Sequence, residues 1–454
     1  MSNSHSKSSG SQSVTPSSYE IYQILLTMNN SNKDVIDIKN LVNEITINES
    51  LFSSSLEVEM RVLDATNLFE LTRLSGGEEI EIKLFRVIDP STTFAEAKSR
   101  MRIKVNIAEI KDLNKKSVGT QLYTFICYST HTFNNSLKKI SRAFNGVPNA
   151  LISDICKRDL GLKDLEPFTN KNTNPIQGIY PNLKPLAAIN WILRNCAGED
   201  NTPLYFYETI QGGLQFNSYS ELLDQETYMT YNNQTFIDSP IDTETYDIAA
   251  TKIRDMTSKF DMSIYNLINK GTFASNIQSL DVSTKDYKNI RYRFKGTPSL
   301  NEFPPLSNEL SFNNTLLKDA DKSHEYFINK NAKAFTDTDN YHNPLEGLLA
   351  DKQSYYNALS YMNIDLILNG DFNLSPGKVI ELKILGIGSE NEVRQFDKSL
   401  SGKYLVTSIA HIFTMEEYTC DIGIQKDSVL FDMNEKLKSI ESSDNKSTGV
   451  LTNG

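Results

Sequence analysis

Cysteine pairs, tryptophan and long apolar runs are scarce in this 454-residue chain, and each scarcity excludes a class of protein. The four cysteines, Cys127, Cys156, Cys196 and Cys420, lie far apart and form no C-x-x-C pair. We therefore expect small buried side chains in a reducing compartment rather than a zinc or redox centre. No run of 18 apolar residues occurs, which predicts no membrane insertion. The first residues also lack the apolar segment of a secretion signal.

Basic residues are outnumbered. Lys and Arg total 46 against 57 Asp and Glu, a net charge of -11. A protein that grips nucleic acid through its phosphates normally carries a basic face, so the composition argues against such a protein, although a local patch stays open. Tyr and Phe are plentiful at 21 and 22 residues, which is typical of a β-rich protein.

Motifs for chemistry are also missing. Of the five histidines, His5 lies in a polar tail, His131 and His324 stand alone, and His342 lies in a polar loop. No H-E-x-x-H, G-x-S-x-G or phosphate-binding glycine motif occurs. His411 falls in phase with apolar residues, so we expect it inside or at the rim of a barrel, satisfied by a nearby backbone group. We predict no catalytic, cofactor-binding or metal-binding residue, and no enzyme.

What the sequence does contain is alternation. Residues 1–18 form a Ser-rich tail, and residues 19–131 then alternate apolar and polar positions in short runs separated by turn residues. One run sets Val58 and Met60 against Glu57, Glu59 and Arg61, and we interpret its carboxylates as a wet outer face. This pattern predicts an antiparallel β-barrel.

Residues 132–240 change to a mixed pattern. A helix is expected from about Asn149 to Leu160, and a second from Pro185 to Cys196, where proline suits the first helical position. A hairpin follows over residues 204–219 with Gly212-Gly213 as its turn. These elements predict a small α+β module.

The second half alternates again. Residues 241–295 and 345–432 are predicted to form a second barrel, interrupted by a polar insertion over 296–344 and followed by a flexible tail over 433–454. Within it we expect a helical stretch near 248–260, strands over 261–268 and 275–282, and a helix over 345–362. A final hairpin over 401–428 is expected to close this barrel.

The order of these segments resembles a known family. The carrying stretches are ESLFSSSLEVEMRVLDATNLFELTRLSGGEEIEIKL, YPNLKPLAAINWILRNCAGEDNTPLYFYETIQGGLQFNSY, NLINKGTFASNIQSLDVSTKDY, GDFNLSPGKVIEL and SGKYLVTSIAHIF. In this order they resemble the baseplate hub proteins of contractile-tailed bacteriophages, a group that includes late control protein D and the N-terminal part of VgrG spikes.

The resemblance implies an α+β, mainly β fold with two tube-type barrels and smaller α+β domains between and within them. It implies a homotrimeric ring that adapts the hexameric tail tube to the trimeric central spike, since two similar domains per subunit let three copies mate with six. The implied partners are further copies of the chain, the spike, the tube or tube-initiator protein and other baseplate proteins. DNA would pass through the lumen without specific binding. The expected location is the virion, after assembly in the host bacterial cytoplasm, with no cofactor.

Three other functions stay open. A tail-associated peptidoglycan-degrading enzyme would need a cleft with an acid and a base. An adhesin for host carbohydrate could use loop aromatics, with Phe303, Phe335 and Tyr341 as candidates. A VgrG-type effector spike would need a β-helical needle after the second barrel.

Overall fold

The structure is a computed structural model. It describes residues 17–428 apart from 31, 73, 88–92, 96, 98, 118, 170–174, 199–200, 234–249, 260–263, 283, 297–298, 302–310, 313–314, 322–323, 331–344 and 387–395. Several predicted features therefore lie outside the described residues: His5, His342, Phe303, Phe335, Tyr341 and the tail over 433–454.

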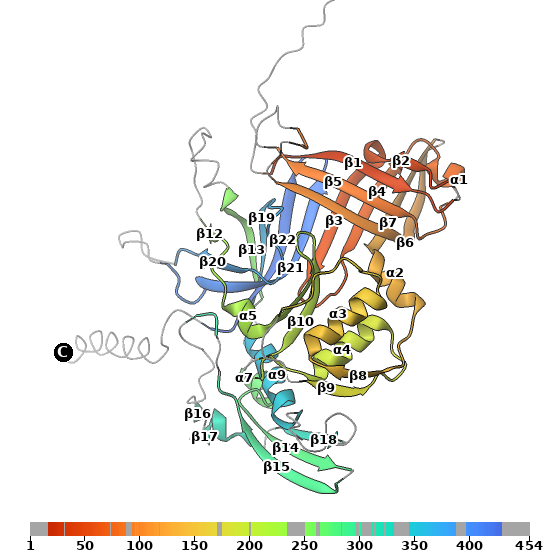
Figure 1. The fold of residues 1–454 in the computed structure, drawn as a ribbon. Coiled ribbons are helices and arrows are strands. Elements are labelled where there is room, and N and C mark those ends of the chain that lie inside the picture. The colour runs from red at the N-terminus through yellow and green to blue at the C-terminus, as the bar shows by residue number, and fades with distance from the viewer. Residues whose placement is uncertain are drawn as a thin grey trace, which may run out of the picture.

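A sheet of thirteen strands dominates the molecule (Figure 1). Two of its strands, β12 (Thr230–Asn232) and β20 (Val379–Lys383), lie off the main path, with β20 pairing both β12 and β21. The other strands follow one path: β13 (Ile253–Lys259), β19 (Met362–Asn369), β22 (Tyr418–Lys426), β21 (Gly402–Thr414), β3 (Val42–Ser50), β4 (Glu57–Asp64), β7 (Thr120–Ser129), β6 (Arg100–Ser117), β5 (Glu79–Arg86), β1 (Tyr19–Thr27) and β2 (Val35–Asp37). The mainly β architecture is confirmed.

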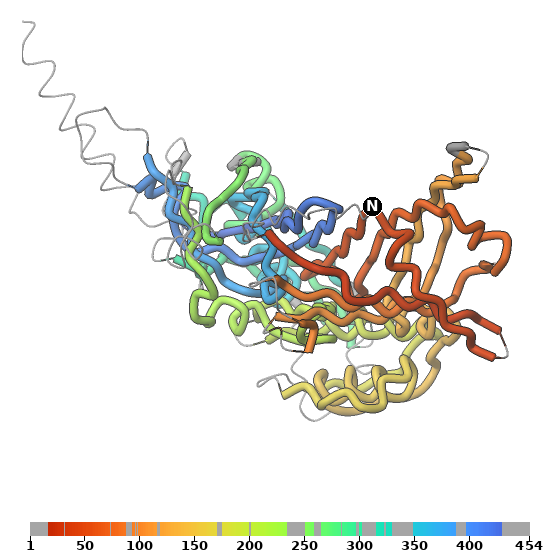
Figure 2. The backbone as a smooth tube through the Cα atoms, turned by 90° about the horizontal axis from the view of Figure 1, so that it is seen from above, coloured from red at the N-terminus to blue at the C-terminus, as the bar shows by residue number. Residues whose placement is uncertain are grey.

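The sheet buries one face in a continuous core. In β4, Val58, Met60 and Val62 are buried while Glu59 and Arg61 are exposed, as the alternation predicts. The core cluster on this face includes residues of both ends of the chain, from Ile24 on β1 to Ile424 on β22. Figure 2 shows the N-terminal strands on one side and the C-terminal strands on the other. A division into two closed barrels stays a prediction.

The final hairpin forms as predicted, and it lies inside the path rather than at its end. β22 pairs with β19 on one side, while β21 pairs with β3 from the first half of the chain. The register with β3 runs from Ser408 opposite Ser50 to Thr414 opposite Glu44. The hairpin therefore does more than complete its own half, because it joins the N-terminal and C-terminal strands into one sheet.

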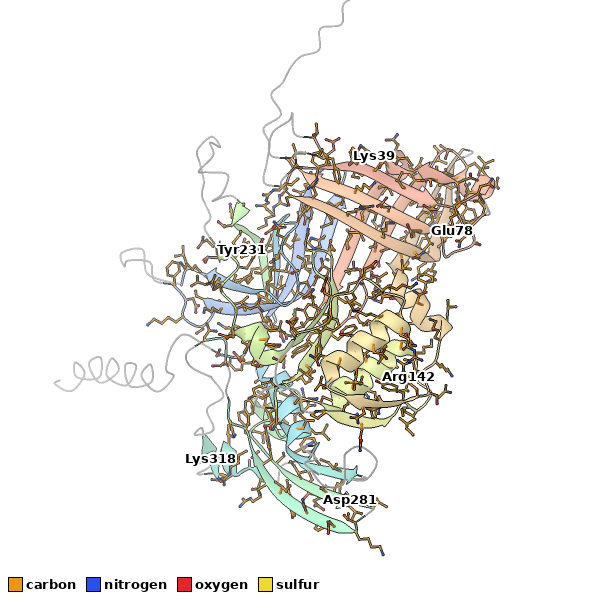
Figure 3. The ribbon with its side chains drawn as sticks, in the orientation of Figure 1. Lys39, Glu78, Arg142, Tyr231, Asp281 and Lys318 are labelled. Carbon is orange, nitrogen blue, oxygen red and sulfur yellow. The ribbon has the colours of Figure 1, made fainter. Side chains whose placement is uncertain are left out.

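The α+β module lies beside the sheet and has its own core. It contains α2 (Thr130–Leu137), β8 (Ala143–Gly146), α3 (Pro148–Arg158), β9 (Ile176–Ile179), α4 (Pro185–Asn195), β10 (Leu204–Thr209), β11 (Gly213–Ser218) and α5 (Tyr219–Leu223). Both predicted helices and the predicted hairpin are confirmed. On its surface Arg142 bridges Asp154 and Asp159, with N–O distances of 2.8 and 2.7 Å (Figure 3).

Two short predictions in the second half are wrong. Residues 253–259 form strand β13 rather than part of a helix, and residues 264–269 form helix α7 (Ile264–Asn269) rather than a strand. Both segments are too short for their apolar spacing to separate the two periods. Pairing with β19 decides the first of them.

The strand predicted over 275–282 forms as β14 (Ala274–Asp281), but it does not pair with the large sheet. It lies between β15 (Asp286–Arg293) and β18 (Glu325–Lys330) in a separate three-stranded sheet, at whose far end Asp281 lies (Figure 3). β18 belongs to the segment predicted as a polar insertion. One face of this sheet packs on α9 (Leu345–Leu359), through contacts that include Ile277 and Tyr355.

Lys352 on α9 ties this region to the α+β module. Its Nζ donates to the carbonyl oxygens of Leu193 at 2.6 Å, Arg194 at 3.3 Å and Cys196, at the C-terminal end of α4. Helices leave their last carbonyls without internal partners, and a cation there also favours the helix dipole. Burial lowers the pKa of Lys352 to about 8. A charged group therefore serves as a buried C-terminal cap.

Replacing this lysine tests the cap. We expect Lys352→Met to lower the free energy of unfolding by about 2 kcal/mol, because buried carbonyls lose their donor. Urea unfolding at pH 7 measures the loss, and Lys403→Met, at an exposed position, should change it by less than about 0.5 kcal/mol. An equal loss of unfolding free energy in the two variants would show that the bonds from Lys352 to the end of α4 do not stabilise the protein.

Candidate functional site

The outer face of the sheet is regular across eight neighbouring strands, from β13 to β6. Its middle row is fixed by the strand registers. The row consists of Asp255, Ile367, Asp421, Ala410, Asn48, Glu57, Tyr128 and Asn106. Because side chains alternate, residues two positions away on each strand share this face. We call it the acidic face.

Carboxylates outnumber cations there. Among the described side chains in register, the acidic residues are Glu44, Glu57, Glu59, Glu109, Asp255, Asp365 and Asp421. The basic ones are Arg61, Lys111, Lys104 and Arg102, fewer than the carboxylates, and each makes an ion pair. Arg61 Nη1 lies 2.7 Å from Glu44 Oε2, and Lys111 Nζ lies 3.3 Å from Glu109 Oε2. Such a surface repels phosphates. The prediction that Glu57 and Glu59 lie on the outer face is confirmed.

Each end of the eight-strand run has a partly unpaired edge in the part of the chain that the structure describes, and Lys252, just before β13, bridges to Asn232 on β12. β13 pairs along its length with β19 alone, and β6 pairs with β5 only from Arg100 to Asn106. Ile107 also bonds to Gly77 and Glu78, just before β5, and beyond it β6 pairs on one side with β7, across three register shifts. Exposed charges line it at Glu109, Lys111 and Lys115. Bulges and charges are typical of strand edges that must not pair indiscriminately.

His411 lies where the two halves of the sheet meet. It is buried on β21, with Nε2 3.0 Å from Glu49 Oε1 on β3 and Nδ1 2.7 Å from the Tyr418 hydroxyl on β22. Cys420 Sγ lies 3.5 Å from the same Nδ1. We call these four residues the junction cluster. The prediction of a buried histidine is confirmed, but the predicted backbone partner is wrong, because its partners are side chains.

The junction cluster holds charge in an apolar setting. Burial by itself would lower the pKa of His411, but Cys420 and the Glu49 carboxylate outweigh it and raise the pKa to about 10. A cysteine, a histidine and a carboxylate in contact resemble a nucleophile with its base and orienting group. Here all three are at most 2% exposed, so no substrate can reach the sulfur. The arrangement is suited to stability rather than to catalysis.

A second buried couple lies beyond the bend between β3 and β4. Glu208 on β10 accepts from the Leu56 N–H at 2.9 Å and from the Ser129 hydroxyl at 2.5 Å. His131 Nε2 lies 3.8 Å from Glu208 Oε2 and 2.7 Å from the Ser54 carbonyl oxygen. Burial raises the pKa of Glu208, which His131 and the hydrogen bonds oppose and the charge of Glu49 supports. Sequence reasoning missed both glutamates, because nothing local distinguishes them from surface residues.

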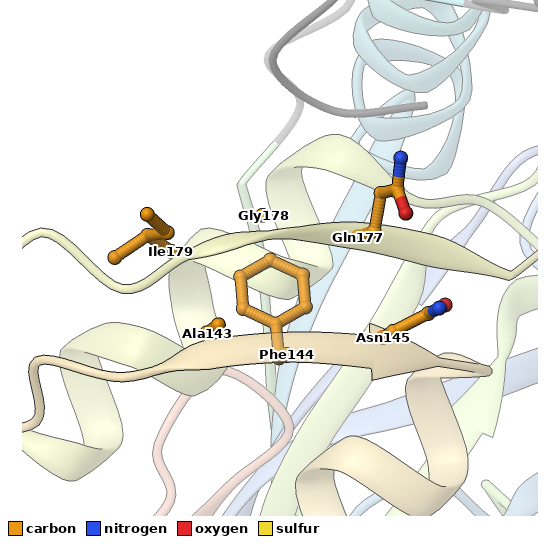
Figure 4. Close-up of a pocket in the computed structure, with 6 residues that line it drawn as sticks. All are labelled: Ala143, Phe144, Asn145, Gln177, Gly178 and Ile179. Atoms are coloured by element: carbon orange, nitrogen blue, oxygen red, sulfur yellow. The ribbon is translucent and has the colours of Figure 1, made fainter. Parts of the chain in front are cut away.

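A shallow depression of about 460 Å³ lies on the β8–β9 ribbon (Figure 4). Its lining comes from Ala143, Phe144, Asn145, Gln177, Gly178 and Ile179. These residues offer amides and apolar surface but no ionisable group, so they supply neither an acid nor a base.

Other candidates fall into structural roles. All four cysteines are free and buried, as predicted, and burial raises the pKa of Cys156 and of Cys196 to about 12. His324 Nδ1 lies 3.1 Å from the Asn269 carbonyl oxygen. Within the described ranges, acidic, histidine and cysteine side chains form no group of three or more placed to hold a metal ion. No helix among those ranges has the length and hydropathy needed to cross a bilayer.

Comparison with known proteins identifies the fold. No family model matches the chain, and no curated protein matches it either. A tail protein from Neisseria meningitidis MC58 has a similar structure, with a TM-score of 0.51 and 11% sequence identity over 90% of this chain and 97% of that one. This chain has the fold of a tail protein.

Two further structures are similar at lower scores. The 43 kDa tail protein of prophage MuSo2 from Shewanella oneidensis gives a TM-score of 0.47 at 10% identity, over 89% of this chain and 98% of that one. A type VI secretion component of E. coli gives 0.42 at 9% identity, over 90% and 76%.

Proposed function

We propose that this chain is a structural subunit of a phage tail, the hub of the baseplate. Three copies form a ring that connects the hexameric tube to the trimeric spike and encloses the DNA path. Contacts with the tube or tube initiator, the spike and other baseplate proteins belong to the same proposal, as does location in the virion. The observation that carries it is an eight-strand face, mainly acidic and with unpaired edges along β13 and along part of β6, on the fold of a tail protein.

The eight-strand run divides into two similar halves. The β21–β3 pairing separates β13, β19, β22 and β21 from β3, β4, β7 and β6, so each chain offers two antiparallel units of four strands. Three chains offer six such units, which lets a threefold ring meet a sixfold tube through similar contacts. Each of the two units corresponds to one tube-type barrel of the proposal.

The open edges explain how copies would join. Free strand edges carry unpaired N–H and C=O groups, and main-chain pairing satisfies them without any particular sequence. In the ring, β6 of one copy lies beside β13 of the next, and the acidic faces join into one wall. Lys and Arg on such a wall would hold DNA through its phosphates, whereas carboxylates leave it free to slide.

Mass in solution tests the ring. We expect light scattering at rising concentration to reach three times the chain mass of 51.3 kDa, with rings visible by electron microscopy. Because all four native cysteines are buried, Lys111→Cys on β6 combined with Thr257→Cys on β13 should cross-link neighbouring copies under oxidation. Lys111→Cys with Leu280→Cys, on the separate three-stranded sheet, is the matched control. A constant 51.3 kDa and no β6–β13 product would contradict the ring.

A further inference from the structure

The β10–β11 hairpin is fastened to the sheet by two buried carboxylates. Glu49 Oε2 accepts the N–H of Ile210, just after β10, at 3.2 Å, while its Oε1 contacts His411. Glu208 accepts the N–H of Leu56, on the far side of the bend, and its own N–H donates to Ser53. Glu49 is only 2% exposed, and Glu208 is partly buried. Tyr205 and Tyr207 of β10 also pack in one apolar cluster with Leu51 and Leu405 of the sheet. The attachment therefore combines this packing with polar bonds whose acceptors carry charge away from water.

His411 provides the positive charge nearest to Glu49. With both ring nitrogens protonated, Nε2 donates to Glu49 and Nδ1 donates to the Tyr418 hydroxyl, which also accepts from the Cys420 thiol. Other titratable groups face the cluster from each neighbouring element. They are Asp371, Lys378, Tyr228, Tyr231, Tyr19, Glu208 and His131.

We propose that the junction cluster is a proton-operated latch: protonated His411 neutralises Glu49 and so holds the β10–β11 hairpin against the bend between β3 and β4, and loss of that proton releases the hairpin. The polar contacts on the hairpin side include these carboxylates and the bend, and Gln211 at the hairpin turn adds bonds to the carbonyl oxygens of Arg100 at 3.4 Å and Phe372 at 3.1 Å. Release therefore exposes the seam between the sheet and the α+β module without unpairing β21 from β3.

The direction of the pH response follows from proton linkage. The pKa of His411 is about 10 in the closed seam, and release, which lets water reach Glu49 while β21 stays paired with β3, lowers that pKa toward its ordinary value of 6.5. A group with a raised pKa contributes stability that is complete below the lower value and is lost as pH rises through the higher one. The raised pKa of Glu208 acts in the same direction at lower pH. Buried Lys352 acts in the opposite direction, since its lowered pKa costs stability that is relieved above about pH 8.

Hydrogen exchange of the full-length protein, read by mass spectrometry and corrected for the intrinsic rate, tests the latch. If the hairpin opens independently, protection of residues 204–218 should fall by about tenfold or more between about pH 7.5 and pH 10.5, because release lowers the pKa of His411 by part of the difference from its ordinary value. Peptides of β1 and β5 should change by less than about threefold. An equal loss of protection in all peptides, or no loss at residues 204–218, would overturn the latch.

Two variants separate the latch from a merely structural cluster. His411→Gln leaves the Glu49 charge buried alone, so residues 204–218 should exchange rapidly already at pH 7.5. The double variant Glu49→Gln/His411→Gln removes both charges, so protection should return and lose its pH dependence. A purely structural role predicts that the double variant is at least as open as the single one. His324→Gln, the same change at a histidine outside the seam, should keep the wild-type response.

Discussion

Alanine at position 370 is expected to destabilise the protein by more than about 3 kcal/mol. A Cβ added to Gly370 would overlap the ring of Tyr418, since Cγ, Cδ1 and Cε1 of that ring all lie closer to it than carbon atoms can approach. Tyr418 has no room to retreat, because it is fully buried, stacked on Phe413 at 4.2 Å and bonded to His411. Gly370 is itself held by its N–H bond to the Tyr418 carbonyl at 3.1 Å. Overpacking of this kind strains both backbones.

Alanine substitutions at two other glycines serve as references for this loss of stability. A methyl group added to Gly119 would have no atom within 4 Å, so Gly119→Ala should lie within about 0.5 kcal/mol of the wild type. Gly423→Ala should fall between them, since its Cβ would meet the rotatable Ser408 hydroxyl at 2.5 Å. Urea unfolding and soluble yield give the ranking. If Gly370→Ala stayed within about 1 kcal/mol, the close packing of the turn onto Tyr418 would be refuted.

Removal of the Glu49 carboxylate should have a similarly large effect. We expect Glu49→Ala to lower the free energy of unfolding at pH 7 by about 3–5 kcal/mol, because His411 loses its counter-charge and the Ile210 N–H loses its acceptor. Glu57→Ala removes a carboxylate from the half-exposed face of the next strand, and should cost less than about 0.5 kcal/mol.

A double-mutant cycle isolates the pair itself. Glu49→Ala/His411→Ala should be more stable than the sum of the single losses predicts, by at least about 1.5 kcal/mol, since neither charge is then left alone. Strictly additive losses would show that Glu49 and His411 do not stabilise each other. The cycle also bears on the latch, whose opening depends on the same neutralisation.

Local residue patterns predict many of the strands, helices and turns of this chain. Alternation around Glu57 and Glu59 predicts both the strand and its outer face, and proline at position 185 predicts where α4 begins. The closing hairpin can be predicted in the same way, because apolar and polar residues alternate along its two strands and a short polar turn joins them. These features depend on neighbours within a few residues, and such neighbours are visible in the sequence.

Which strands pair with each other cannot be predicted from such local patterns. His411 and Glu49 are 362 positions apart, and their contact exists because β21 pairs with β3. Long-range pairing also decides the position of β14 and β15, which form strands but join a separate sheet with β18. The alternation of apolar and polar residues in a strand shows which face is buried. The strand that pairs with it is selected by long-range packing, and many different strands carry the same alternation. The sequence by itself thus determined most of the elements and the faces they bury, apart from the two short segments at 253–259 and 264–269. Only the tertiary structure decided which strands meet at the junction and where its buried charges come together.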